Sequence, residues 1–63
     1  MKTLRKIIEE RKQYITTNKV CYCTYGKVLA TYSINELSEE KLNQRYYARD
    51  WFIEDGDLCV MHF

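Results

Sequence analysis

The sequence predicts a small α+β domain in which the elements follow the order α-β-β-α-β-β. Residues 3–15 place apolar side chains with a helical period, whereas residues 19–33 are dense in β-branched and aromatic residues around Gly26. An Asp55-Gly56 pair between two apolar runs is a strong hairpin signal. We expect a single domain over residues 1–63, built as one four-stranded antiparallel sheet with both helices on one face.

The first helix is expected over residues 3–15. Its apolar positions fall on one helical face, namely Leu4, Ile7, Ile8, Tyr14 and Ile15. The opposite face is charged, and the polar run at 16–18 ends the periodic pattern.

The next segment is expected to form a hairpin that turns at Tyr25-Gly26. This register pairs Cys23 with Val28, Tyr22 with Leu29 and Cys21 with Ala30. It places Cys21 and Cys23 on a face with small apolar residues, which suits close packing of a helix. We therefore interpret the cysteine face as the floor of the core.

A second helix is expected at about 39–46, because Ser38 is a good N-cap and two glutamates follow it. The last hairpin then turns at Asp55-Gly56. Its predicted register pairs Ile53 with Leu58, Phe52 with Cys59, Trp51 with Val60 and Arg49 with His62.

Both faces of the last hairpin are apolar, although two short helices can cover only one side of such a sheet. Soluble monomers seldom expose a large contiguous apolar patch, so the second face is a candidate association surface. The side chains expected to anchor a protein partner there are Tyr22, Leu29, Phe52, Met61 and Phe63, with Trp51 among them if the register is inverted. A partner chain, most simply a second copy in a homodimer, would also stabilise so short a chain.

Nucleic-acid binding is the alternative hypothesis. Residues 1–33 carry seven Lys or Arg against two acids, and residues 34–63 carry three against seven, so the two halves have net charges of +5 and −4. Exposed tyrosines beside cations suit stacking on single-stranded bases. The candidate contacts are Lys2, Arg5, Lys6, Lys12 and Lys19. Against this hypothesis, the overall net charge is only +1.

Three cysteines and one histidine raise the question of a tetrahedral metal site formed by Cys21, Cys23, Cys59 and His62. The spacing argues against it. Cys21 and Cys23 share a strand face about 6–7 Å apart, and residues three apart on a strand point to opposite faces. We expect free thiols, no metal and no cofactor.

The chain has few of the residue sets that catalysis uses. It contains one histidine and two glycines, with no phosphate-binding loop and no H-E-x-x-H or G-x-S-x-G motif. No apolar run is long enough for a membrane span or a signal peptide, and the odd number of cysteines favours a reducing compartment. We therefore expect a cytoplasmic, non-enzymatic interaction protein, a regulator or inhibitor for which a phage is a candidate source.

Overall fold

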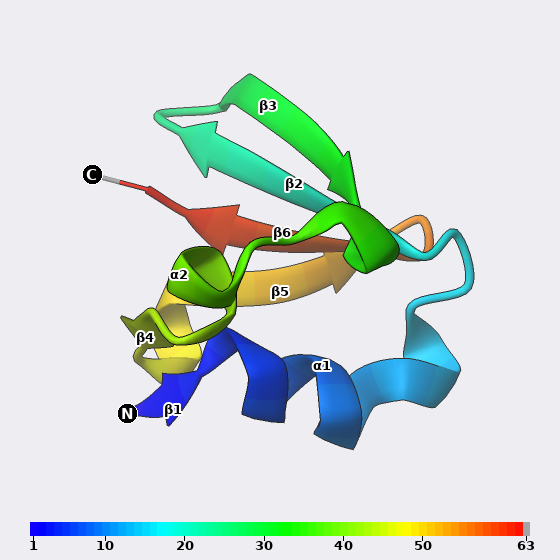
Figure 1. Ribbon diagram of the computed structural model, residues 1–63. Helices are drawn as coiled ribbons and strands as arrows, with labels where there is room; N and C mark the ends of the chain where they lie inside the picture. Colours follow the sequence, from blue (N-terminus) through cyan, green and yellow to red (C-terminus); the bar gives the residue numbers. More distant parts are fainter. Residues whose placement is uncertain (63) are drawn as a thin grey trace.

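The structure is a computed structural model, and it describes residues 1–62 (Figure 1). Its longer elements are helix α1 and the four strands of the main sheet, joined by short helical turns. In chain order the elements are β1 (Lys2–Thr3), α1 (Leu4–Arg11), η1 (Lys12–Tyr14), β2 (Lys19–Thr24), β3 (Lys27–Ser33), η2 (Ile34–Glu36), α2 (Glu39–Leu42), β4 (Arg45–Tyr46), η3 (Ala48–Asp50), β5 (Trp51–Glu54) and β6 (Asp57–Met61).

The main sheet is mixed, so the prediction of a purely antiparallel sheet was wrong. Its strand order is β3-β2-β6-β5, and the two central strands β2 and β6 run parallel. The segment between β3 and β5 crosses one face of the sheet before β6 returns beside β2 (Figure 1). Thr17 fixes the start of β2 next to the last hairpin, because its backbone N–H and its hydroxyl both donate to the Gly56 carbonyl, at 3.2 and 2.9 Å.

The first helix matches its prediction closely. Thr3 caps α1 by accepting a hydrogen bond from the Lys6 N–H at 3.2 Å, and η1 continues the helical path to Tyr14. Ser38 caps α2 in the same way, with the Lys41 N–H as donor. However, α2 ends at Leu42, because the following residues form β4 and pair with β1 in a second, two-stranded sheet. Strands of only two residues, such as β1 and β4, are too short to leave a periodic signal in the sequence.

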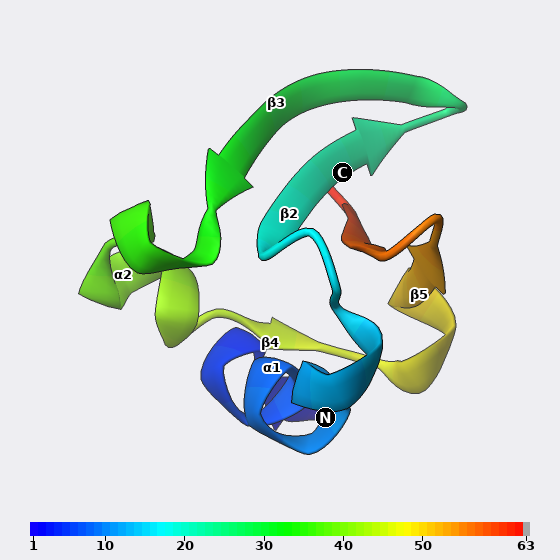
Figure 2. The same cartoon turned by 90° about the vertical axis from the view of Figure 1, so that its right-hand side faces the viewer.

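Both helices pack on the same face of the main sheet, as expected. Figure 2 shows α1, α2 and β4 grouped on one side of the four strands. The buried cluster combines the inner faces of α1, the loops around α2 and the central strands, namely Leu4, Ile7, Ile15, Val20, Tyr22, Leu37, Tyr46, Leu58 and Val60. In this cluster Leu4, Ile7, Val20, Leu58 and Val60 have no exposed surface.

Both predicted turns are confirmed, but the register of the first hairpin is only partly correct. Cys23 pairs with Val28 as expected, and a β-bulge then shifts the register so that Tyr22 lies opposite Ala30 rather than Leu29. In the second hairpin the three predicted pairs are present: Trp51 with Val60, Phe52 with Cys59 and Ile53 with Leu58. Arg49 belongs to η3 and does not pair with His62.

Candidate interaction surface

The strand register assigns the side chains of the main sheet to two faces. Residues that lie side by side on neighbouring strands point to the same face. Two rows cross the covered face, Tyr32–Val20–Leu58–Ile53 and Ala30–Tyr22–Val60–Trp51, and they carry the buried cluster. Two rows cross the opposite face, Thr31–Cys21–Cys59–Phe52 and Val28–Cys23–Met61. We call these last seven residues the open face.

The expected assignment of the cysteines to the core floor was therefore wrong. Val20 and Tyr22 point into the core, so Cys21 and Cys23 point away from it. The β-bulge changes the neighbours of the cysteines as well: beyond it, Ala30 and Tyr32 join the covered face and Thr31 lies opposite Cys21. Cys59 shares the open face, so all three thiols lie on one side of the sheet.

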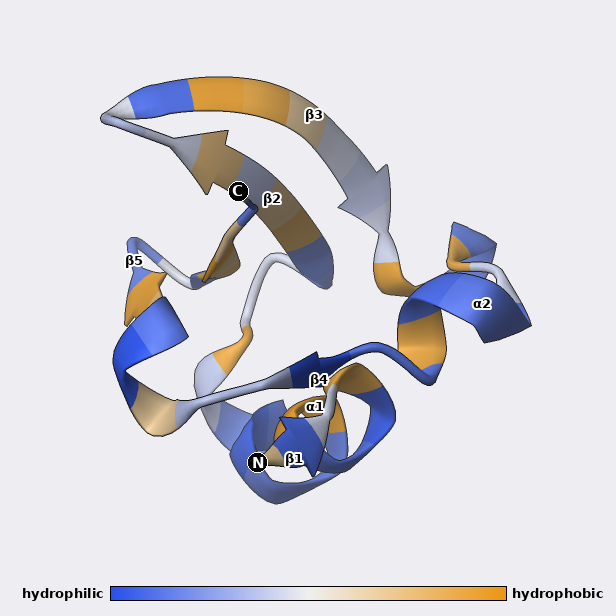
Figure 3. Cartoon of the chain, turned by 90° about the vertical axis from the view of Figure 1, so that its left-hand side faces the viewer, coloured by the Kyte–Doolittle hydropathy of each residue, from blue (hydrophilic) through white to orange (hydrophobic). Residues whose placement is uncertain are grey.

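The open face combines exposed apolar side chains with a shallow hollow. Phe52 is 44% exposed and Val28 is 63% exposed. Figure 3 shows an apolar stretch in the first half of β3. A hollow of about 430 Å³ runs along this face between the two hairpin turns, and its acidic end is formed by Glu54, Asp55 and Asp57.

The Cys59 thiol on this face is chemically unreactive, and Cys21 has polar neighbours. Cys21 lies 3.7 Å from the Thr31 hydroxyl and 3.8 Å from the Asp57 carboxylate, so its sulfur has polar neighbours on two sides. Burial raises the pKa of the Cys59 thiol to about 12, and the neighbouring cysteines and acids add to the shift. A thiol that stays protonated at neutral pH is a poor nucleophile and a poor metal ligand.

The four candidate metal ligands do not converge. Cys21, Cys23 and Cys59 lie on the open face, whereas His62 lies beside the Tyr22 ring on the covered side, with ring centroids 6.1 Å apart. Within residues 1–62, no three His, Cys, Asp or Glu side chains are grouped to hold a metal ion.

The five residues expected to anchor a partner do not all lie on one face of the sheet. Phe52 and Met61 lie on the open face. The expectation that Tyr22 anchors a partner was wrong, because its side chain points into the core and is only 4% exposed. Leu29 is 52% exposed but lines a pocket on the covered side. Phe63 lies outside the described residues.

The sequence placed Val28 on the cysteine face, as the structure does, but that face was interpreted as the core, and Thr31 was placed on the opposite face. Strand β2 alternates two apolar sets of nearly equal size, so the pattern alone did not indicate which set faced the helices. The bulge then inverted the assignment for the outer part of β3, and nothing in the sequence marks its position.

The candidate nucleic-acid contacts are partly neutralised by acids. Lys2 pairs with Glu10 at 2.6 Å, Arg5 pairs with Glu39, and Lys6 lies 3.8 Å from Glu9. The hydrogen bond from Lys2 also holds the pKa of Glu10 below its ordinary value. These pairs break up the basic face of α1, which weakens the footprint that phosphate backbones require. Lys12 and Lys19 are exposed.

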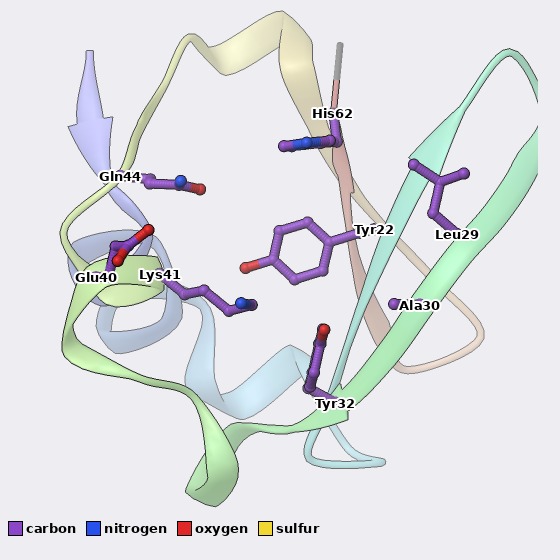
Figure 4. Close-up of a pocket in the computed structure, with 8 residues that line it drawn as sticks. All are labelled: Tyr22, Leu29, Ala30, Tyr32, Glu40, Lys41, Gln44 and His62. Carbon is purple, nitrogen blue, oxygen red and sulfur yellow. The ribbon is translucent and has the colours of Figure 1, made fainter.

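A second candidate site lies on the covered side, between the β2–β3 hairpin and α2 (Figure 4). It is a pocket of about 210 Å³ that contains the Tyr22 hydroxyl. Burial raises the pKa of Tyr22, and the nearby Tyr46 and Tyr32 raise it further. This hydroxyl therefore remains a protonated donor.

None of the helices described over residues 1–62 has the length and apolar character needed to cross a membrane. Comparison of the chain with protein-family models, with curated proteins and with solved structures finds no match.

Proposed function

We propose that the chain is a non-enzymatic interaction module, a regulator or inhibitor that associates with a second copy of itself through the open face. The observation that carries this proposal is a four-stranded sheet with helices on one side and Val28, Met61 and Phe52 on the other. Aromatic and methionine side chains are enriched in the centres of protein interfaces. The buried, protonated Cys59 fits a packing role better than a chemical one.

A second copy is favoured by the charges at the two ends of the open face. The turn at Asp55-Gly56 carries Glu54, Asp55 and Asp57, and the turn at Tyr25-Gly26 is followed by Lys27. Because β2 and β6 run parallel, these turns lie at opposite ends of the sheet (Figure 1). Lys27 pairs with Thr24, one position beyond the open-face pair of Cys23 and Val28, so it lies exposed at the rim of the sheet and not on the open face itself. Two sheets stacked face to face with strands antiparallel bring each acidic end beside the partner's first turn and its rim lysine, which is the self-complementarity that a two-fold axis requires.

The size of the face predicts a weak dimer. Four strands about 4.8 Å apart and about 17 Å long outline roughly 300 Å² on each chain. Stable complexes bury about 1,200 Å² or more in total, so this interface belongs to the weak, concentration-dependent class.

Sedimentation equilibrium over a range of concentrations tests the proposal. The wild type should change from one chain mass toward two as its concentration rises. Phe52→Asp places a charge at the β5 edge of the open face, on its exposed aromatic side chain, and should keep the chain monomeric. Tyr14→Asp is the matched control, because Tyr14 is exposed to a similar degree, 53% against 44% for Phe52, but lies on η1 away from the sheet. It should associate as the wild type does.

The orientation of the two copies has its own test. Lys27→Glu should weaken association, and combining it with Glu54→Lys should restore it, because the exchange returns opposite charges to each contact. A wild type that stays monomeric at every concentration, or a Phe52→Asp variant that associates normally, contradicts the proposal.

A further inference from the structure

The tip of the first hairpin carries an aromatic residue in a backbone conformation that aromatic residues rarely adopt. Tyr25 has φ 46° and Gly26 has φ 79°, the two left-handed conformations of a type I′ turn. Asparagine, aspartate and glycine are the usual residues there, and the second hairpin follows this preference with Asp55. A bulky side chain at positive φ costs free energy, so asparagine in place of Tyr25 would relieve strain in the turn.

The strained tyrosine is also the most exposed large hydrophobic side chain of residues 1–62. Tyr25 is 87% exposed, against 44% for Phe52. A fully covered aromatic side chain buries about 150–250 Å², and tyrosine is enriched among the residues that contribute most to binding. Backbone strain at an exposed aromatic residue therefore points to a role in contact with another molecule.

The position of this turn on the sheet favours a second copy of the chain as that molecule. Gly26 lines one end of the hollow on the open face, and Asp55 lines the other end. These turns lie at opposite ends of the sheet (Figure 1), so two sheets stacked with strands antiparallel place each first turn beside the partner's acidic turn. Stacked sheets are about 10 Å apart, and a long side chain at the end of one sheet extends into that gap.

The acidic turn offers acceptors that suit a tyrosine hydroxyl. None of the salt bridges formed within residues 1–62 uses Glu54 or Asp55, and both side chains are exposed. A phenol donates one hydrogen bond, and a carboxylate is an acceptor only. Hydrogen bonds to an ionised acceptor are the stronger kind, so a tyrosine beside this turn gains both a contact and a charge-assisted bond.

We propose, resting on the self-association argued above, that Tyr25 anchors the dimer at its rim. Its ring covers the acidic turn of the other copy, and its hydroxyl donates a hydrogen bond to the carboxylate of Glu54 or Asp55 there. A two-fold axis repeats the contact, so each dimer contains it twice. The two rings add to the roughly 300 Å² of open face on each chain, which by itself forms a weak interface.

Tyr25→Asn separates the cost of this residue in the single chain from its benefit in the dimer. Asparagine tolerates positive φ, so the urea midpoint should rise when it is measured at a concentration where the chain is monomeric. The variant also loses the ring and the hydrogen bond at both contacts. Its dimer dissociation constant in sedimentation equilibrium should therefore increase by about tenfold or more. Tyr14→Asn, on η1 and at a tyrosine that is 53% exposed, should leave association unchanged.

A double-mutant cycle tests the acceptor. Tyr25→Phe keeps the ring and removes only the hydroxyl, so it should weaken association by about fivefold. The acceptor background combines Glu54→Gln with Asp55→Asn, which replaces both carboxylates by neutral amides and keeps a residue that tolerates positive φ in the turn. In that background Tyr25→Phe should weaken association by about twofold or less, because the charge-assisted bond is already absent.

The wild type and Phe52→Asp separate this inference from the function on which it rests. A wild type that stays monomeric contradicts both. If the wild type associates and Phe52→Asp does not, but Tyr25→Asn associates as tightly as the wild type, only the role of Tyr25 is contradicted. A Tyr25→Asn chain that is less stable than the wild type would also overturn that role, because the tyrosine would then serve the fold of the single chain. Equal effects of Tyr25→Phe in the two backgrounds would overturn the assignment of the acceptor.

Discussion

Individual side chains of the main sheet have their chemistry set by the neighbours that cover them. Cys59 lies in the middle of the open face, yet it is buried, because Cys21 and Phe52 flank it on the adjacent strands. Burial disfavours the thiolate, and the nearby acids Glu54 and Asp57 disfavour it further. A residue can therefore lie on an uncovered sheet face and still be protected from reaction.

The raised pKa of Cys59 predicts a loss of stability in mild alkali. The pKa is about 12 in the folded chain against an ordinary value of 9.0, so the unfolded chain releases this proton first as the pH rises. The stabilisation is complete below about pH 9 and decreases as the pH rises toward the folded value. Urea denaturation between about pH 9 and about pH 10 should show a free energy of unfolding that falls with pH.

Cys59→Ala isolates this effect from other groups that titrate in alkali. The variant loses stability at every pH through the cavity it creates, so the slope with pH is the quantity to compare. The slope should be shallower than that of the wild type. Equal slopes in the two proteins would show that Cys59 titrates alike in the folded and unfolded chains.

The hairpin turns are the elements that fix the strand registers. Tyr25 and Gly26 both have positive φ, as do Asp55 and Gly56, which is the type I′ geometry that suits the twist of paired strands. The two glycines differ in their surroundings. A Cβ at Gly26 would meet nothing within 4 Å, whereas a Cβ at Gly56 would lie 2.2 Å from Thr16 Oγ1. The second turn is thus also the place where the loop before β2 packs against the last hairpin.

Alanine at these two glycines separates backbone strain from packing. Gly26→Ala should lower the free energy of unfolding by about 1 kcal/mol, because only the positive φ is penalised. Gly56→Ala should cost about 2–4 kcal/mol, because the new Cβ also displaces Thr16. Urea denaturation of both variants measures the difference.

A third variant shows where the additional cost arises. In Thr16→Ala combined with Gly56→Ala, the clashing oxygen is absent, so the cost of Gly56→Ala measured against the Thr16→Ala background should approach that of Gly26→Ala. If the additional cost persisted, the contact with Thr16 would not be its cause.

Local signals in the sequence predicted most elements but not their assembly. The period of residues 4–15, the Ser38 cap and both glycine turns are short-range features, and each appears where expected. The faces of β2 were reversed, because Val20 with Tyr22 and Cys21 with Cys23 are both apolar pairs at the same period. The pocket beside Tyr22 is lined by residues from β3, α2 and the position after β6, so no local pattern in the sequence predicts it.

On the scale of the whole molecule, the parallel pair at the centre of the sheet joins distant parts of the chain. Strand β6 pairs with β2 on one side and with β5 on the other, so it holds the two hairpins together. Leu58 and Val60 of β6 are fully buried. Without β6, the first hairpin and β5 share no strand contact in the main sheet.

Truncation after Gly56 should therefore abolish the fold. The shortened chain loses the central strand and two fully buried side chains, and an isolated two-stranded hairpin is marginal in water. Its ¹H–¹⁵N spectrum should collapse to the narrow dispersion of an unfolded chain, with the full-length chain as reference. A well-dispersed spectrum from the fragment would show that β6 is dispensable.

The pairing of β2 with β6 also has a consequence for synthesis of the chain. At about 5–20 residues per second, a ribosome adds the first residue of β6 roughly 2 to 7 s after the last residue of β2. Until β6 pairs with it, the inner edge of β2 has no neighbour and its N–H and C=O groups are free to pair with another strand. A chain in which β6 has not yet paired with β2 is thus the state most open to aggregation, and it arises in every refolding event as well as after synthesis.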